Sequence, residues 1–262
     1  MNRIESKFNE LKTKNKKAFI AYITAGDPDL ATTQKIALAL EKAGVDIIEL
    51  GVPFSDPLAD GPVIQAASQR ALAKKVTMRK IFAMSASLRK KTEIPLVFMT
   101  YYNPVLRYGL KNFFYSCRKS GVDGVIVPDL PHEEAGELIK RGHAENVATI
   151  FLVAPTSTKK RVKDIVRSSK GFVYYVSLTG VTGARKKLPQ DVAAKIRVVK
   201  SVSDKPLAVG FGVSTPKQAA MLAKIADGVI VGSAIVKMVG DRNALSKVSR
   251  FVRQLSRAIH EA

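Results

Sequence analysis

The chain has 262 residues, which fits one large α/β domain or two small ones. Its 46% hydrophobic content is enough for a sizeable core, and no apolar run reaches the ~18 residues that a spanning helix needs. A single cysteine, Cys117, excludes an internal disulfide framework, and we expect it to pack in a helix. With no secretory signal evident at the N-terminus, these features predict a cytoplasmic protein.

The formal net charge of +21 is large and has two interpretations. Basic residues could contact the phosphates of a nucleic acid, or they could be solvated faces of outer helices. The clusters fall at regular intervals, mostly in expected outer helices, without a nucleic-acid motif or interleaved aromatic residues. We therefore expect no nucleic acid partner, although a basic field would favour an anionic substrate or an acidic partner.

The first predicted element is an amphipathic helix over residues 1–17, with Ile4, Phe8 and Leu11 as its apolar positions. Short apolar runs predict strands at residues 18–26, 45–51, 94–100, 122–127, 147–153, 171–177, 206–209 and 227–231. Helices are expected at about residues 30–43, 62–74, 77–91, 107–120, 132–143, 158–169, 190–203 and 215–224, in a short segment from 234, and at 242–260. Residues 101–104 are predicted to be a loop.

Eight strand–helix units in one chain predict a (β/α)8 TIM barrel, a single domain over residues 1–262, with an extra N-terminal helix and a short extra helix after strand eight. An open doubly wound sheet is the alternative, and it would need fewer strands or a clear domain break. In a barrel, chemistry belongs to the loops that follow the strands.

Three carboxylates lie at the second strand and in the loop after it. Glu49 sits inside an apolar strand, where a carboxyl group is costly unless it is paired or used. Asp56 and Asp60 lie on the loop, and both are also ordinary turn residues before Pro and Gly. One carboxyl could move a proton while another holds a polar N–H group or balances charge.

Glycine loops follow the last three predicted strands, at residues 180–184, 210–212 and 232–233. Each could be an ordinary tight turn, but three adjacent glycine loops followed by a short helix favour a phosphate site. Ser233 would add a hydroxyl donor. Tyr174 faces the same way as Phe172 and Val176, and from its position alone it is a core residue or an accessory to the site.

We predict no metal site, because the three histidines are far apart and no Cys/His spacing fits zinc. No glycine motif for a dinucleotide or for ATP occurs in the required context. The residues therefore predict a cofactor-free barrel enzyme that acts on a small phosphorylated substrate by carboxylate acid–base chemistry.

The chain resembles the α subunit family of tryptophan synthase. The segments that match the family run from the first strand to the last: residues 18–28, 46–62, 99–104, 127–131, 180–184, 209–212 and 231–234. The resemblance implies retro-aldol cleavage of indole-3-glycerol phosphate to indole and glyceraldehyde 3-phosphate. It implies that Glu49 is the acid–base residue, that Asp60 accepts the indole N–H, and that Tyr174 is the active-site tyrosine.

The same resemblance implies phosphate-binding positions at Gly183, Gly212, Gly232 and Ser233, and an indole pocket with Tyr22 and Phe211. It implies that Thr182 contacts Asp60 when the loop at residues 178–189 closes. Leu178 and the Arg185–Lys187 run in this loop are this chain's own.

The resemblance also implies a partner, a pyridoxal-phosphate β subunit in an α2β2 assembly, with residues 53–60 at the interface. Pyridoxal phosphate would belong to that partner. Two alternatives stay open at this point. The chain could be a non-catalytic partner that activates a β subunit, or it could be another phosphosugar barrel enzyme of the same pathway.

Overall fold

The computed structural model describes residues 1–176, 190–240 and 244–262, with the side chains of residues 190–192 left out. A nine-stranded sheet has the order β5-β4-β3-β2-β1-β9-β8-β7-β6, and every pairing in it is parallel. The strands are β1 (Ala18–Thr24), β2 (Ile47–Gly51), β3 (Leu96–Met99), β4 (Gly124–Ile126), β5 (Ala148–Ile150), β6 (Leu152–Val153), β7 (Val173–Val176), β8 (Leu207–Gly210) and β9 (Gly228–Val231). Because only Phe151 separates β5 from β6, the sheet is a nearly closed barrel, as predicted.

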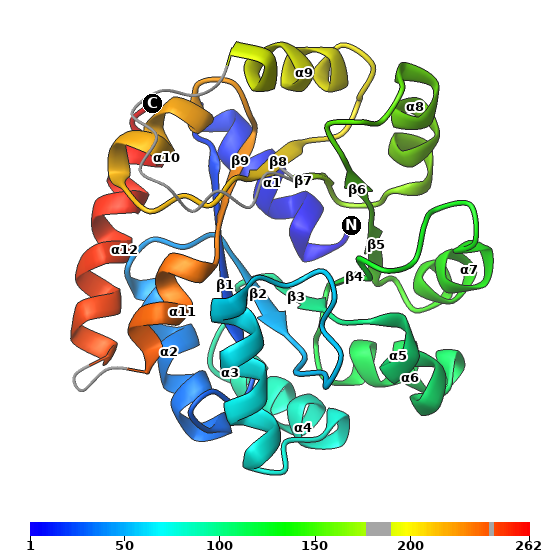
Figure 1. The fold of residues 1–262 in the computed structure, drawn as a ribbon, viewed down its shortest axis with the longest axis vertical. Coiled ribbons are helices and arrows are strands. Elements are labelled where there is room, and N and C mark those ends of the chain that lie inside the picture. Colours follow the sequence, from blue (N-terminus) through cyan, green and yellow to red (C-terminus); the bar gives the residue numbers. More distant parts are fainter. Residues whose placement is uncertain (177–189, 241–243) are drawn as a thin grey trace.

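Helices surround the strands (Figure 1). They are α1 (Arg3–Thr13), α2 (Leu30–Lys42), α3 (Pro62–Ala73), α4 (Met78–Arg89), α5 (Tyr102–Tyr108), α6 (Leu110–Lys119), α7 (Gly136–Ala144), α8 (Lys159–Ser168), α9 (Gln190–Lys200), α10 (Pro216–Ala223), α11 (Ser233–Val239) and α12 (Ala244–His260). The predicted short helix after the last strand is α11.

Three local predictions were wrong. Residues 101–104 are not all loop, because α5 begins at Tyr102 and places Pro104 in its first turn, where a missing N–H costs no helical hydrogen bond. The expected helix at 107–120 is divided by Gly109, whose φ of 84° ends α5 and precedes α6. The fifth predicted strand is also interrupted, at Phe151.

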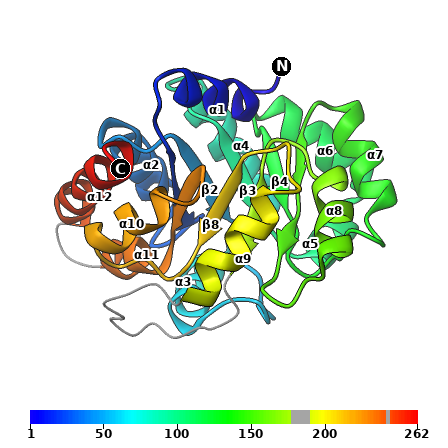
Figure 2. The same cartoon turned by 90° about the horizontal axis from the view of Figure 1, so that it is seen from above.

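Helix α1 lies across one end of the barrel (Figure 2). Its predicted apolar positions Ile4, Phe8 and Leu11 are buried with the residues that fill the barrel interior, and Phe8 packs on Phe172 with ring centroids 5.7 Å apart. Asn2 caps the helix by accepting the N–H of Ile4, and its side-chain amide donates to the carbonyl of Asp123 at 2.8 Å. The amino-terminal end of the barrel is therefore closed by packing.

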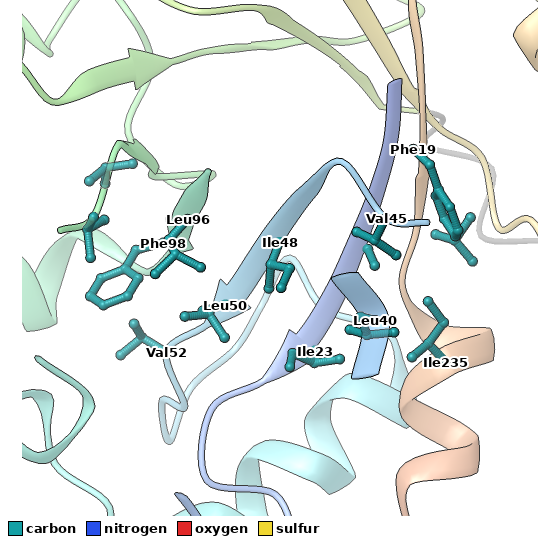
Figure 3. Packing of buried hydrophobic residues seen from close by; sticks show 14 of the residues in the cluster. Phe19, Ile23, Leu40, Val45, Ile48, Leu50, Val52, Leu96, Phe98 and Ile235 are labelled. Carbon is teal, nitrogen blue, oxygen red and sulfur yellow. The ribbon is translucent and has the colours of Figure 1, made fainter. Parts of the chain in front are cut away.

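The larger core lies between the strands and the surrounding helices. Ile48 and Leu50 of β2 belong to it, together with Leu40 of α2 and Phe98 of β3 (Figure 3). Ile47 instead belongs to the cluster inside the barrel. Because side chains alternate along a strand, Glu49 projects to the same side as Ile47, into the barrel and near its carboxyl end.

Cys117 is buried, as expected. Within the described ranges, no helix combines the length and apolar character that crossing a membrane requires.

Candidate active site

A cavity of about 320 Å³ opens at the carboxyl end of the barrel. Strands from both halves of the sheet and the loops after them contribute to its walls. Its lining residues are Tyr22, Glu49, Ala59, Asp60, Gly61, Pro62, Val63, Ile64, Met99, Tyr174, Val176, Gly210, Phe211, Gly212, Ile230, Gly232 and Ser233. The mixture of apolar and polar groups suits a small ligand with an apolar ring and a polar end.

Glu49 lies in the floor of this cavity and is 1% exposed. Neither carboxyl oxygen has a hydrogen-bond partner within the described part of the chain. Burial, and secondarily the charge of Asp60, raises the pKa of Glu49 to about 8. The group is therefore mostly protonated at neutral pH, and it can give up a proton or take one back near that pH.

Asp60 reaches the same cavity from the loop between β2 and α3. Burial raises the pKa of its carboxyl to about 6, against the opposing effect of a hydrogen bond with the Tyr101 side chain. Asp60 is consequently ionised at neutral pH while Glu49 holds its proton. The two carboxyls have different protonation states in one cavity, which suits them to different roles in a reaction.

Tyr101 holds the loop that carries Asp60, and the sequence interpretation did not identify it. Its hydroxyl accepts the backbone N–H of Ala59 at 2.9 Å, and its ring lies 5.3 Å from that of Phe54. It is 6% exposed. Its position just after the third strand was the available signal, since loops at strand ends build barrel sites.

Two tyrosines in the cavity wall pack against glycines of the neighbouring strand. A Cβ at Gly51 would overlap the tip of the Tyr22 ring, and a Cβ at Gly210 would lie 2.7 Å from the Tyr174 hydroxyl. The arrangement brings Tyr174 into the site, although it was only an accessory candidate from its position in the sequence.

The cavity lining also contains the predicted phosphate positions that the structure describes. Gly212, Gly232 and Ser233 line the cavity together with Phe211. Gly212 has a φ of 60°, a conformation that favours glycine. Thr182 and Gly183 lie outside the described residues, as does the loop at 178–189 to which they belong.

Some lining residues were not singled out from the sequence. Met99 ends β3 and Ile64 lies in the first turn of α3. Met99 could have been found by strand alternation, because it faces the same side as Val97 of the inner cluster. Asp56 is exposed and accepts a hydrogen bond from the Ser55 hydroxyl at 2.6 Å, outside the cavity lining.

The comparison with protein families decides the relationship. The family model described as tryptophan synthase alpha chain matches residues 8–260. The chain belongs to the tryptophan synthase alpha chain family. The recognition made from the sequence motifs is thereby confirmed.

Two alpha chain relatives illustrate how far the similarity extends. The tryptophan synthase alpha chain of Citrifermentans bemidjiense is 51% identical over 237 residues, which cover 90% of this chain and 89% of the relative. That of Caldanaerobacter subterraneus is 49% identical over 259 residues, covering 97% and 98%.

Solved structures of alpha chains share the fold. The tryptophan synthase subunit alpha of Legionella pneumophila matches with a TM-score of 0.92 at 37% identity, over 99% of this chain and 98% of that one. A chain of Mycobacterium tuberculosis tryptophan synthase matches with a TM-score of 0.92 at 39% identity, over 99% and 98%. The barrel described above is therefore the fold of the alpha chain family.

Proposed function

We propose that this chain is the lyase subunit of tryptophan synthase and cleaves indole-3-glycerol phosphate to indole and glyceraldehyde 3-phosphate. The observation that carries the proposal is Glu49, a buried carboxyl without a hydrogen-bond partner in the described chain, in a cavity that Asp60 shares. A buried carboxyl of this kind is costly to the fold and is typical of a catalytic group. Membership of the alpha chain family supports this reaction.

Glu49 moves the proton. With a pKa of about 8 it is protonated at neutral pH, and it donates this proton to C3 of the indole ring. Protonated C3 makes the ring an electron acceptor, so the bond between C3 and the glycerol chain breaks with its electron pair going to the ring. The Glu49 carboxylate takes the proton of the adjacent hydroxyl as that carbon becomes an aldehyde. The enzyme then holds the same proton count as before.

Asp60 stabilises the charge that develops on the ring nitrogen. When C3 is protonated, positive charge spreads to the indole N–H, and an ionised carboxylate that accepts this N–H favours the intermediate. A pKa of about 6 keeps Asp60 ionised at neutral pH. Tyr101 holds Asp60 and the preceding amide in place, so the carboxylate does not have to reorganise during the reaction.

The substrate phosphate is held at the glycine wall of the cavity. No lysine or arginine is among the described lining residues, so we assign the contacts to backbone N–H groups near Gly212 and Gly232 and to the hydroxyl of Ser233. We include Gly183 from the family pattern, which gives Thr182 a contact with Asp60 on loop closure and not with the phosphate. The indole ring occupies the apolar side, between Tyr22 and Phe211 and beside Met99 and Ile64, and Tyr174 completes this wall.

The chain would act with a tryptophan synthase β subunit in an α2β2 assembly in the cytoplasm. The loop at residues 53–60 is our candidate contact, and it carries Leu58, whose side chain is 94% exposed. Pyridoxal phosphate would belong to the β subunit, because the cleavage on this chain needs only acid–base groups and a phosphate site. Closure of the loop at 178–189 over the substrate is part of the same proposal.

The test is indole formation from indole-3-glycerol phosphate by the isolated chain, and then with a β subunit in the absence of serine. The chain has no tryptophan, so indole fluorescence can be followed without a protein indole background. We expect slow cleavage by the isolated chain and faster cleavage with the β subunit. No cleavage in either condition would overturn the proposal and favour a non-catalytic partner of β.

A further inference from the structure

Tyr22 lies across the neighbouring strand rather than above its own. In the pairing of β1 with β2, Tyr22 is opposite Glu49 and Thr24 is opposite Gly51. The hydroxyl end of the Tyr22 ring nevertheless lies against Gly51. The ring therefore runs two residues towards the carboxyl end of the barrel, beside the strand that carries Glu49.

Only a residue without a side chain at position 51 leaves room for this ring. A Cβ there would overlap the Oη and Cζ atoms of Tyr22 and would lie 2.8 Å from Cε2. Contacts this short do not occur between real atoms, so the ring would have to move. Gly51 is an ordinary strand residue, and its backbone conformation does not itself call for glycine.

The other sides of the ring leave one direction for that movement. Tyr22 forms a small buried cluster with Ala67 of α3 and Val236 of α11, both of which are at most 1% exposed. Its base lies against Gly232, where an added Cβ would be 3.4 Å from the Cβ of Tyr22. The remaining side faces the cavity, so a displaced ring enters the space beside Glu49.

We propose that Gly51 is a positioning residue, whose missing side chain seats the Tyr22 ring against β2 and so keeps open the aromatic part of the cavity beside Glu49. The ligand class is a planar apolar ring with one N–H, and the choice of indole as the probe rests on the proposed function. The pair Tyr22–Gly51 then determines the width of this part of the site.

The test uses Gly51→Ala, Tyr22→Leu and the double variant, with indole binding measured by the fluorescence anisotropy of indole itself. We expect Gly51→Ala to weaken indole binding about tenfold or more, because the ring is driven into the cavity. Tyr22→Leu should weaken it about fivefold by removing an aromatic contact. The double variant should bind within about threefold of Tyr22→Leu, because the shorter side chain no longer meets the methyl group added at position 51. Tyr22→Phe cannot replace Tyr22→Leu in the double variant, because the ring atoms Cζ and Cε2 of a phenylalanine would still meet the Cβ added at position 51.

Gly228→Ala is the matched control, because it also adds a methyl group to a glycine in a strand of this barrel. Its Cβ would meet Ala18 and Ala208 at 3.3 Å, away from the cavity lining. It should reduce stability while leaving indole affinity within about twofold of the parent. In steady-state cleavage, the effect of Gly51→Ala should fall mainly on KM, since the acid–base groups remain in place.

Wild-type affinity in Gly51→Ala would overturn the proposal, and so would a double variant whose loss is the product of the two single losses. If Gly51→Ala does not fold, the proposal still requires the double variant to fold, and an unfolded double variant contradicts it. Failure of the proposed function has a different signature. In that case, the parent would release no indole from indole-3-glycerol phosphate, whatever the coupling measured by binding.

Discussion

The two ends of the barrel each contain a buried carboxylate, and their surroundings are opposite. Asp123, at the amino-terminal end, is 5% exposed, and its oxygens accept from Arg89 at 2.9 Å, Arg3 at 3.1 Å and the backbone N–H of Leu96 at 2.9 Å. Glu49, near the carboxyl-terminal end, is 1% exposed and has no such partner in the described chain. Burial is common to both groups, and the partners are what differ.

The difference in partners indicates a structural role for Asp123 and a chemical role for Glu49. Burial raises the pKa of both carboxyls, but at Asp123 the Leu96 N–H and the charges of Arg89 and Arg3 oppose the rise. Asp123 thus joins α1, α4 and the start of β3 through charged hydrogen bonds. The Glu49 carboxyl makes no hydrogen bond within the described chain, so its proton is available for transfer to a ligand. The comparison predicts that removing Asp123 affects folding, whereas removing the Glu49 carboxyl affects turnover.

The largest expected effect is on catalysis by Glu49→Gln. The amide keeps the shape of the side chain but cannot transfer a proton, so kcat for indole release should fall at least about 10²-fold. Indole formed from indole-3-glycerol phosphate is the measurement. Asp56→Asn is the control, because Asp56 is an exposed carboxylate of the next loop and should keep parental activity in the isolated chain. Undiminished turnover in Glu49→Gln would contradict the assignment of Glu49 as the acid–base residue.

The converse variant is Asp123→Ala, which should lower the free energy of unfolding by about 3–5 kcal/mol, because Arg89 would be left largely buried without its carboxylate. Urea denaturation measures the loss, and the folded protein should keep its kcat. Glu93→Ala is the control: Glu93 also pairs with Arg3, at 2.7 Å, but on the exposed surface, where the loss should be much smaller than in Asp123→Ala. Equal losses in the two variants would contradict the structural role of Asp123.

A third prediction concerns the pH dependence of stability at Glu49. Its pKa is 4.5 in the unfolded reference and about 8 in the fold, so between these values the folded state keeps a proton that the unfolded state has released. Parental stability from this group is fully present below about pH 4.5 and is lost as pH rises towards about 8. Glu49→Gln has no carboxyl at this position, so its stability does not fall with pH for this reason. From pH 5.5 to 7.5 its stability relative to the parent should therefore rise by about 3 kcal/mol, or about 1.4 kcal/mol per pH unit.

Denaturant midpoints of the two proteins across this pH range test the third prediction. Asp60 titrates in both proteins, so most of its contribution cancels in the difference. A stability difference that stays constant with pH would mean that Glu49 is already ionised in the folded protein.

The barrel and the position of Glu49 in it could be predicted from the sequence because they depend on local patterns. Apolar runs alternating with helices predict the parallel sheet, and strand alternation places Glu49 with Ile47. The three apolar positions of α1 predict its buried face.

The contacts between loops and between strands could not be predicted in this way. The hydrogen bond from Ala59 to Tyr101 joins two loops, and the contact of Tyr22 with Gly51 depends on the register of two strands. The break at Gly109 depends on a positive φ, which the amino acid permits but does not require.

The smallest expected effect concerns Asp46, a second carboxylate that can be compared with Glu49 along the same strand. Asp46 comes just before β2, three positions ahead of Glu49, and it is also a carboxylate with partners, its side chain 11% exposed. It accepts the N–H of Phe19 at 2.8 Å, and Nε2 of His260, at the end of α12, lies 2.8 Å away.

His260→Ala should lower the free energy of unfolding by about 1–2 kcal/mol, because Asp46 loses one hydrogen bond but keeps its backbone partner. For a chain of this size, the melting temperature should fall by about 2–4 °C. His143→Ala is the control, because His143 is exposed on α7 and its removal should change stability by less than about 0.5 kcal/mol. Cleavage activity should be unchanged in both variants. A loss of activity in His260→Ala at a temperature where it is folded would mean that the amino-terminal end of β2 influences Glu49, and the separation between the two ends of the barrel would fail.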